Sequence, residues 1–490
     1  MLKKCLYKYL GRVGVPIACL SFAFVACKTP ALMTKTENRA VPGSYNNAPD
    51  STNTGKVRWA DFFTDPNLNA LIETALKNNQ DLNISLQEIA IANNEIRARQ
   101  GAYLPVVGIG GAAGVNRAGR YTSEGVLEGN TETTLDTRMP YFLTNFALGP
   151  SASWEVDIWR KLRTAKKAAV IRYQSSVEGR NFAITNLVSD IATAYYELLG
   201  LDNELAIVQQ NLDIQTNALR LVRTLKEATR VTELAVRRFE AQVLNTQGLQ
   251  YGIRQRIVET ENRINFLTGR YPQQPIVRDA QAFSTLVPAV VRTGIPSQLL
   301  GNRPDIKQAE LNLVAAKLDV KVAKANFYPS LNISAAVGVN AFNPAVLLRP
   351  ESILFSLVGG LAGPWINRNG IIASYYSANA RQTQAAYQYE RTVLNAYIEV
   401  ANQLSNISNL EKSYDTKAKQ VEALTQSVVI SNTLFNAARA DYTEVLFTQR
   451  DALESRFQLI ETKVQQLNAM VSMYRALGGG WNQSGNATSK

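Results

Sequence analysis

Few residues of this 490-residue chain could take part in a chemical reaction, and histidine is absent from the sequence. The chain therefore lacks the commonest general base and a frequent metal ligand. Glu155 and Asp157 form the clearest candidate pair, since carboxylates two residues apart on a strand share one face and could act as acid and base. No pocket around them can be read from the sequence. We interpret both as polar positions facing a lumen and expect no enzyme activity.

A glycine-rich segment and three cysteines complete the candidates. The segment from Gly108 to Ala113 superficially fits a dinucleotide-binding loop, but such a loop has to open a helix. A Gly- and Thr-rich stretch follows it instead, so we assign these small residues to a strand. The three cysteines are Cys5, Cys19 and Cys27, and processing of that segment would leave no pair of thiols. We expect no metal site and no cofactor beyond a covalent lipid.

The first 26 residues are predicted to be a signal peptide. A basic start precedes an apolar run of about 14 residues, shorter than the roughly 20 that a helix needs to cross a bilayer. The sequence from Phe24 to Cys27 resembles a bacterial lipobox, which implies a diacylglycerol group and an N-acyl chain on Cys27. Residues 27–55 would then form a lipidated tether, whose Thr, Asn, Pro and Ser content favours flexibility. An ordinary cleaved signal peptide with a bystander cysteine is the alternative.

The formal net charge of +12 raises the question of nucleic-acid binding. Lys and Arg are scattered among Asp and Glu, and basic runs do not exceed pairs such as Lys166-Lys167 and Arg237-Arg238. We interpret these charges as solvated helix faces and expect no nucleic-acid partner.

The chain repeats one plan twice at a spacing of roughly 200 residues, and such repetition is typical of a duplicated fold. Three pairs of similar segments occur in the same order: Ala102–Pro105 and Asn326–Pro329, Ala194–Leu198 and Ala396–Val400, Val231–Leu234 and Tyr442–Val445. We therefore predict a first repeat over 56–271, a second over 272–481 and a C-terminal tail over 482–490.

Each repeat is predicted to contain two strands: 106–115 with 148–159, and 331–340 with 354–366. Apolar Ala152, Trp154 and Val156 alternate with polar residues, which gives that strand one apolar and one polar face. Strands that cross a membrane must close into a barrel, and the smallest membrane barrels have about eight strands. Four strands per chain therefore predict that copies pool their strands. Three copies give twelve, although the arithmetic alone would also allow two copies.

Two very long helices are predicted over 161–228 and 370–437, because neither range contains proline. At about 1.5 Å per residue, each spans roughly 100 Å. Turns near 229–232 and 439–442 then lead into returning helices over 233–268 and 443–477. A pore-less antiparallel coiled coil of a periplasmic structural protein is the alternative, but such a protein has no need of the alternating strands.

Four segments resemble motifs of outer-membrane factors of the TolC/OprM type, in the same order along the chain. They are Trp154–Arg163, Ile295–Ile306, Gly363–Gly370 and Leu477–Trp481, the last resembling the end of the OprM-like, NodT-type lipoprotein branch. The resemblance implies an α+β membrane protein in which three chains form a twelve-stranded barrel and a long α-helical periplasmic barrel. It also implies a passive outer-membrane duct that exports drugs, detergents or metals. The implied partners are a periplasmic adaptor and an inner-membrane pump, commonly of the resistance-nodulation-division type. An exit duct for type I protein secretion stays open as an alternative.

The resemblance also points to two sets of site residues. The helical tips, expected to contact the adaptor, lack the glycine usual in the family and comprise Thr229, Arg230, Val231, Ala440, Asp441 and Tyr442. Relatives place an aspartate at the periplasmic gate after a Val-Leu pair, where this chain has Phe447. We expect a gate formed by Thr443, Glu444, Phe447 and Arg450, with a ring of Phe447 closing the entrance by dewetting. Packing of Phe447 between helices as core is the alternative.

Overall fold

The computed structural model describes residues 29–32, 35–45, 52–132, 142–364, 366–437 and 439–482, which form two compact units. Unit 1 holds the described residues before Glu37 together with Ala90–Gln174 and Leu311–Ala386. Unit 2 holds Glu37–Ile89, Ser175–Glu310 and the chain from Tyr387 onward. Each unit thus draws on both predicted repeats, because the strands of one repeat pair with those of the other.

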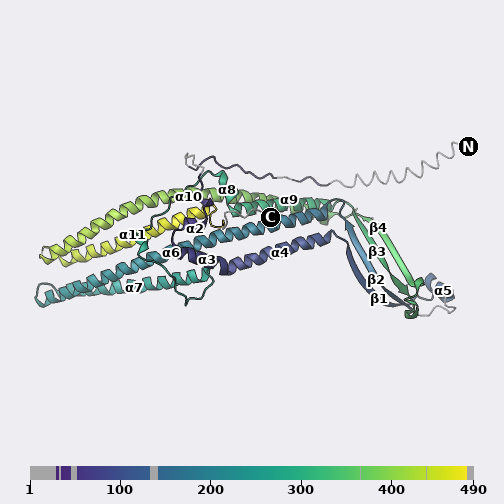
Figure 1. The fold of residues 1–490 in the computed structure, drawn as a ribbon, viewed down its shortest axis with the longest axis horizontal. Helices are drawn as coiled ribbons and strands as arrows, with labels where there is room; N and C mark the ends of the chain where they lie inside the picture. Colours follow the sequence, from purple (N-terminus) through teal and green to yellow (C-terminus); the bar gives the residue numbers. More distant parts are fainter. Residues whose placement is uncertain are drawn as a thin grey trace. The chain divides into compact units, whose positions relative to one another are not determined.

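Unit 1 contains one antiparallel sheet of four strands in the order β1-β2-β3-β4 (Figure 1). The strands are β1 Val106–Asn116, β2 Leu143–Val156, β3 Ser330–Ala341 and β4 Ile353–Ala362. β2 begins before the predicted residue 148 and stops before 159, since the chain turns after Val156 to start a helix. β4 ends before the predicted residue 366, and Pro364, which cannot donate a ladder hydrogen bond, follows its end.

The connection between β1 and β2, predicted as a loop, contains a short helix. α5 spans Ser123–Asn130, and the Thr122 hydroxyl accepts a hydrogen bond from the Gly125 amide at 3.1 Å, which caps its N-terminus. Two 3₁₀ turns, Pro344–Val346 and Pro350–Ser352, lie between β3 and β4.

The long helices occupy the predicted ranges to within one residue at each end. They are α6 Lys161–Glu227, α7 Glu233–Leu267, α10 Asn369–Asn436 and α11 Tyr442–Ala476. Shorter elements complete the fold: η1 Thr54–Lys56, α2 Trp59–Phe62, α3 Pro66–Asn78, α4 Gln80–Ala102, η2 Ala282–Ser284, α8 Ser297–Asn302 and α9 Pro304–Ala325. Among the helices of the described residues, none is both long and apolar enough to cross a bilayer.

The main core of unit 2 lies where α3, α6 and α11 meet. Leu68, Ile191 and Leu467, one from each helix, are all at most 1% exposed. Phe62 stacks on Tyr474 with ring centroids 4.1 Å apart, and the Tyr474 hydroxyl donates to the Val57 carbonyl at 2.6 Å. These contacts fix the helices halfway along the chain's two helical hairpins.

Within the predicted tether, residues 37–45 pack against other parts of unit 2, while Leu32 packs against a cluster of unit 1 around Phe327. The Tyr45 ring is 8% exposed and stacks on Tyr397 at 5.3 Å. Arg39 pairs with Glu310 at 2.9 Å, and the Asn38 amide donates to the Glu390 carboxylate, also at 2.9 Å. Side chains distant in sequence therefore contact a segment whose composition favours a linker.

Candidate functional site

The sheet of unit 1 has two faces of opposite character. Residues paired directly across neighbouring strands point to the same face, and Val107, Ala152, Ala335 and Leu357 form one such row. Apart from Thr144, the large side chains of this face are apolar, and they include Val107, Ile109, Val115, Trp154, Ile333, Val337, Phe355, Leu357 and Leu361. Phe355 is 84% exposed and Leu357 76% exposed. Such a contiguous exposed apolar face marks a membrane or protein contact.

The opposite face of the sheet is small and polar. Its members include Gly108, Gly110, Ala112, Ser151, Ser153, Glu155, Asn332, Ser334, Asn340 and Ser356, with Val106, Leu143, Leu354 and Val358 as apolar exceptions. Small side chains let a closed sheet keep a wide interior, and polar ones tolerate water there. The face suits a solute path better than a packed core.

Asp157 lies after the end of β2, so the expectation that it faces a lumen from the same strand as Glu155 is wrong. Its two carboxylate oxygens accept hydrogen bonds from the Leu162 amide at 3.0 Å and the Arg163 amide at 2.9 Å, which caps the N-terminus of α6. Glu155 remains on the polar face and pairs with Lys161. Both carboxylates line a pocket of about 410 Å³ beside Trp159, but their charges are already compensated. They are therefore poorly suited to proton transfer.

The first helical tip turns through a strained residue. Thr229 has φ +57°, and its amide donates to the Lys226 carbonyl at 2.8 Å while the Arg230 amide donates to Leu225 at 2.9 Å. This pair of bonds is a Schellman cap, whose left-handed position is usually glycine. α7 ends with the same bonds at Gly269, φ +68°. The absence of glycine therefore adds backbone strain at Thr229, while the turn keeps the same hydrogen bonds.

Ion pairs join the two helices behind this tip. Glu233 on α7 pairs with Lys226 on α6 and with Arg237 at 2.9 Å, and Arg237 also contacts Glu240 at 2.9 Å. The hydrogen bond from Lys226 holds the pKa of the Glu233 carboxyl below its usual value. Because these groups are exposed, the cluster aligns the hairpin and adds little stability.

The six predicted tip residues divide by exposure. Thr229, Arg230 and Asp441 are exposed, while Ala440 is partly buried. Val231 and Tyr442 are also partly buried and pack against a cluster of α6 and α7 that includes Phe239. The two hairpins are therefore joined near their tips, and a partner can reach only part of the predicted set.

The predicted gate residues lie on the first three turns of α11. Phe447 is 53% exposed, and the Arg450 guanidinium lies over its ring, 5.2 Å from the centroid. Glu444 is exposed and Thr443 is partly buried. The structure brings Phe447 and Arg450 together, and Phe447 is not part of the core of its own chain.

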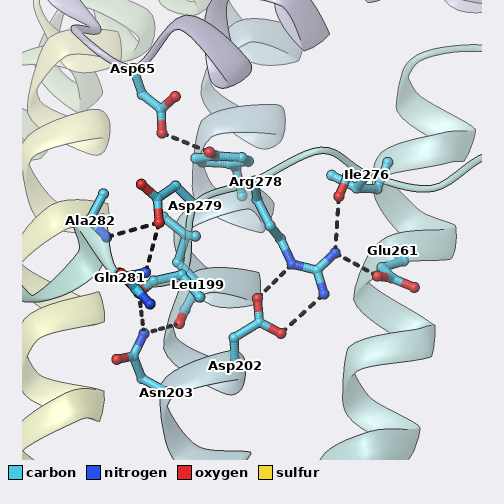
Figure 2. Close-up of polar contacts among 12 residues, drawn as sticks. Asp65, Leu199, Asp202, Asn203, Glu261, Ile276, Arg278, Asp279, Gln281 and Ala282 are labelled. Carbon is cyan, nitrogen blue, oxygen red and sulfur yellow. Dashed lines mark hydrogen bonds and ion pairs between the residues drawn. The ribbon is translucent and has the colours of Figure 1, made fainter. Parts of the chain in front are cut away.

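Two arginines that the sequence analysis did not single out as site residues organise unit 2: Arg278 is partly buried and Arg303 is buried. Figure 2 shows Arg278 donating to both oxygens of Asp202 at 2.5 and 3.0 Å, and to Glu261 at 2.6 Å. This joins the segment after α7 to α6 and α7. Arg303 is 5% exposed and donates to Glu399 at 2.7 Å and to the Ala476 carbonyl at 2.9 Å. In the sequence, only the Arg-Pro-Asp run at 303–305, within the motif Ile295–Ile306, pointed to Arg303.

A lysine of α11 is also buried in unit 2. Lys463 is 8% exposed, donates to the Ser284 carbonyl at 2.7 Å and lies 5.3 Å from the centre of the Phe283 ring. Burial lowers the pKa of its ammonium.

No group of three or more acidic, Cys or His side chains suited to a metal ion occurs in the part of the chain that the structure describes. The predicted lipid attachment site Cys27, together with Trp365 and Ala438, lies outside that part.

Comparison with known proteins gives one consistent family. Residues 71–270 and 295–479 match the profile described as outer membrane efflux protein. The chain is 28% identical over 465 residues to the pyoverdine export outer membrane protein OpmQ of Pseudomonas putida, covering 94% of this chain and 96% of that protein. It is 26% identical over 444 residues to the cation efflux system protein CusC of Escherichia coli, covering 90% and 91%. The toluene efflux pump outer membrane protein TtgI of Pseudomonas putida is 26% identical over 427 residues, covering 87% and 88%.

Solved structures share the fold. A crystal structure of CusC superimposes with a TM-score of 0.80 at 22% identity, covering 91% of this chain and 99% of that one. The open state of the Neisseria gonorrhoeae MtrE outer membrane channel gives 0.80 at 21% identity, covering 94% and 100%.

Proposed function

The chain belongs to the outer membrane efflux protein family, and from this premise we propose that three copies form a passive exit channel of a tripartite efflux system. The protein is an outer-membrane channel component and not an enzyme. The channel would accept small solutes from an inner-membrane pump and release them outside the cell, while the pump supplies the energy.

The single observation that carries this proposal is the two-faced sheet with two edge strands. β1 and β4 form the edges of the four-stranded sheet in the described chain. Edge strands expose unpaired amide and carbonyl groups, which in lipid must find partners. Pairing β4 of one copy with β1 of the next would close twelve strands around the small, polar face. The apolar face would then contact lipid along its whole height.

The helical hairpins supply the proposed contacts with an adaptor. Of the six expected residues, the exposed Thr229, Arg230 and Asp441 are available for direct contact. We assign Val231 and Tyr442 a supporting role, because they pack the tips together. The adaptor and the pump are proposed as classes, with a pump of the resistance-nodulation-division type.

The proposed gate is a ring of Phe447 from three copies, with Arg450 beside it. A partly exposed aromatic side chain near a threefold axis lies against its two symmetry mates and excludes water when the ring is narrow. Thr443 and Glu444 would form the outer rim. Arg450 keeps its charge next to the ring, so opening would expose a polar lining.

The exported solute is proposed as a small molecule. The relatives are named for pyoverdine, toluene and cations, three very different chemistries. A channel shared by such cargoes has no reason to carry a specific binding pocket, and selection then falls to the pump. Acylation of Cys27 with a diacylglycerol group and an N-acyl chain remains a proposal, tested by mass spectrometry of the mature N-terminus.

Single-channel recording in planar bilayers, combined with crosslinking to count subunits, tests the proposed function. We expect a crosslinked trimer that shows small, discrete openings and spends most of the time closed. A protein that stays monomeric or dimeric and never conducts would overturn the pore and favour the structural coiled coil.

A further inference from the structure

The positive charge of this chain is concentrated in the helical part of unit 1. We define a basic collar as the segments next to the strands: residues 90–105, 157–174, 311–329 and 366–386. These segments contain thirteen Lys and Arg but three Asp and Glu, whereas the chain as a whole has 52 against 40. The helices that adjoin the sheet therefore carry most of the net charge.

The collar begins where the apolar face of the sheet ends. Trp154 closes that face, and its indole NH donates to the Tyr103 carbonyl at 3.0 Å. The Lys166 ammonium lies over the Tyr103 ring, 5.8 Å from its centroid. Along this line an apolar surface gives way to aromatic rings and then to a cation. The same order is typical of proteins at the boundary between acyl chains and headgroups.

The second repeat also places a cation over an aromatic ring, although this ring is buried, with Phe327 3% exposed. Phe327 occupies the position of Tyr103 in the repeated segment, and the Arg368 guanidinium lies over its ring at 5.1 Å. Each strand pair thus ends in an aromatic ring covered by a cation from the segment after its second strand. Two independent occurrences make a chance contact a poor explanation.

We propose that the basic collar binds anionic phospholipids of the inner leaflet of the outer membrane, with their phosphates at Lys166 and its neighbours and their acyl chains on the apolar face. This inference rests on the proposed function, since it requires the sheet to cross that membrane with the helices on the periplasmic side. Lys and Arg near an anionic lipid surface each strengthen attraction, and the effect falls within about 10 Å at moderate salt.

The test uses the full-length protein in proteoliposomes and bromine-labelled lipids, which quench nearby tryptophans such as Trp154 and Trp159. The measured quantity is the binding of brominated phosphatidylglycerol relative to brominated phosphatidylcholine. We expect the wild type to bind phosphatidylglycerol in preference to phosphatidylcholine. In the double variant Lys166→Gln, Lys167→Gln, this preference should fall about fivefold for each charge removed. The matched control Lys412→Gln, Lys419→Gln removes the same charge from exposed positions of α10 and should leave the ratio unchanged.

Two further measurements separate the alternatives. The variant Lys166→Arg, Lys167→Arg keeps the charge and should keep the lipid preference, which distinguishes lost binding from lost folding. Equal ratios in the wild type and the glutamine variant would overturn the proposal. A changed potassium-to-chloride permeability with an unchanged lipid ratio would also overturn it, because the collar would then line the lumen. Failure of every variant and of the wild type to conduct would instead contradict the proposed channel.

Discussion

Replacing Phe447 with alanine tests the proposed gate through the equilibrium between its closed and open states. The side chain is 53% exposed in the single chain, so about half of a phenylalanine surface, roughly 100 Å², is free to contact other copies. At about 25 cal/mol per Å², full burial of that area in a closed ring contributes about 2.5 kcal/mol per copy. Loss of one such contribution shifts the closed-to-open ratio about 60-fold, and loss from three copies shifts it further.

The assay is the open probability in planar bilayers, together with the sensitivity of cells to vancomycin. We expect Phe447→Ala to raise both. Leu234→Ala is the matched control, because Leu234 is 56% exposed on the first tip and lies outside the proposed ring. Unchanged conductance and an unchanged leak would refute the gate. A less stable trimer with an unchanged open probability would assign Phe447 to subunit packing instead.

The remaining predictions concern local stability and pH. Thr229→Gly should relieve the strain of the left-handed backbone and slow hydrogen exchange at the tip. After the entropy cost of glycine is subtracted, the slowing should correspond to about 0.5–1 kcal/mol. Faster exchange would contradict the presence of strain. Arg303→Met should destabilise the protein by about 3 kcal/mol in thermal unfolding, because it leaves the partly buried Asp305 carboxylate uncompensated and the Ala476 carbonyl without its donor. The lowered pKa of Glu233 should stabilise its tip at pH values above the pKa that this carboxyl has in the unfolded chain. The stabilisation should be lost as pH falls through the lower pKa of the folded protein. Hydrogen exchange at low pH should show this loss in the wild type and not in Glu233→Gln. Because the pKa of Lys463 is lowered in the folded protein, wild-type stability should rise as pH increases from this lowered pKa toward 10.5, the ordinary pKa of lysine. Thermal unfolding of Lys463→Met should show no such rise.

The regular elements could be predicted because their signals are local. The alternation around Trp154 gave the two faces of β2, and the proline-free ranges gave α6 and α10 to within one residue. The four motifs carried the family, which the profile match confirms. Strand ends were less accurate, since the residue at which pairing stops depends on the partner strand and on the turn that follows.

Among the expected site residues, a contact could be predicted only where both partners lie on the same helix or strand. Phe447 and Arg450 sit one turn apart on α11, so their contact follows from helical spacing. Val231 and Tyr442 were expected at the tips, but both pack on the cluster of α6 and α7 around Phe239, which for Tyr442 is the other hairpin. The burial of Tyr442 depends on how the two hairpins meet, and no period in the sequence reports that.

The sequence alone determined which segments are helix, which are strand, and which face of each strand is apolar, because those properties follow from side-chain periodicity over a few residues. The tertiary structure alone decided the partners of polar and aromatic groups that meet across hundreds of residues. Tyr45 is buried on Tyr397, and Arg303 is held by carboxylates and a carbonyl from three different elements. Such contacts form only when distant segments are brought together, and a buried polar group then takes whichever partner the packing places within reach.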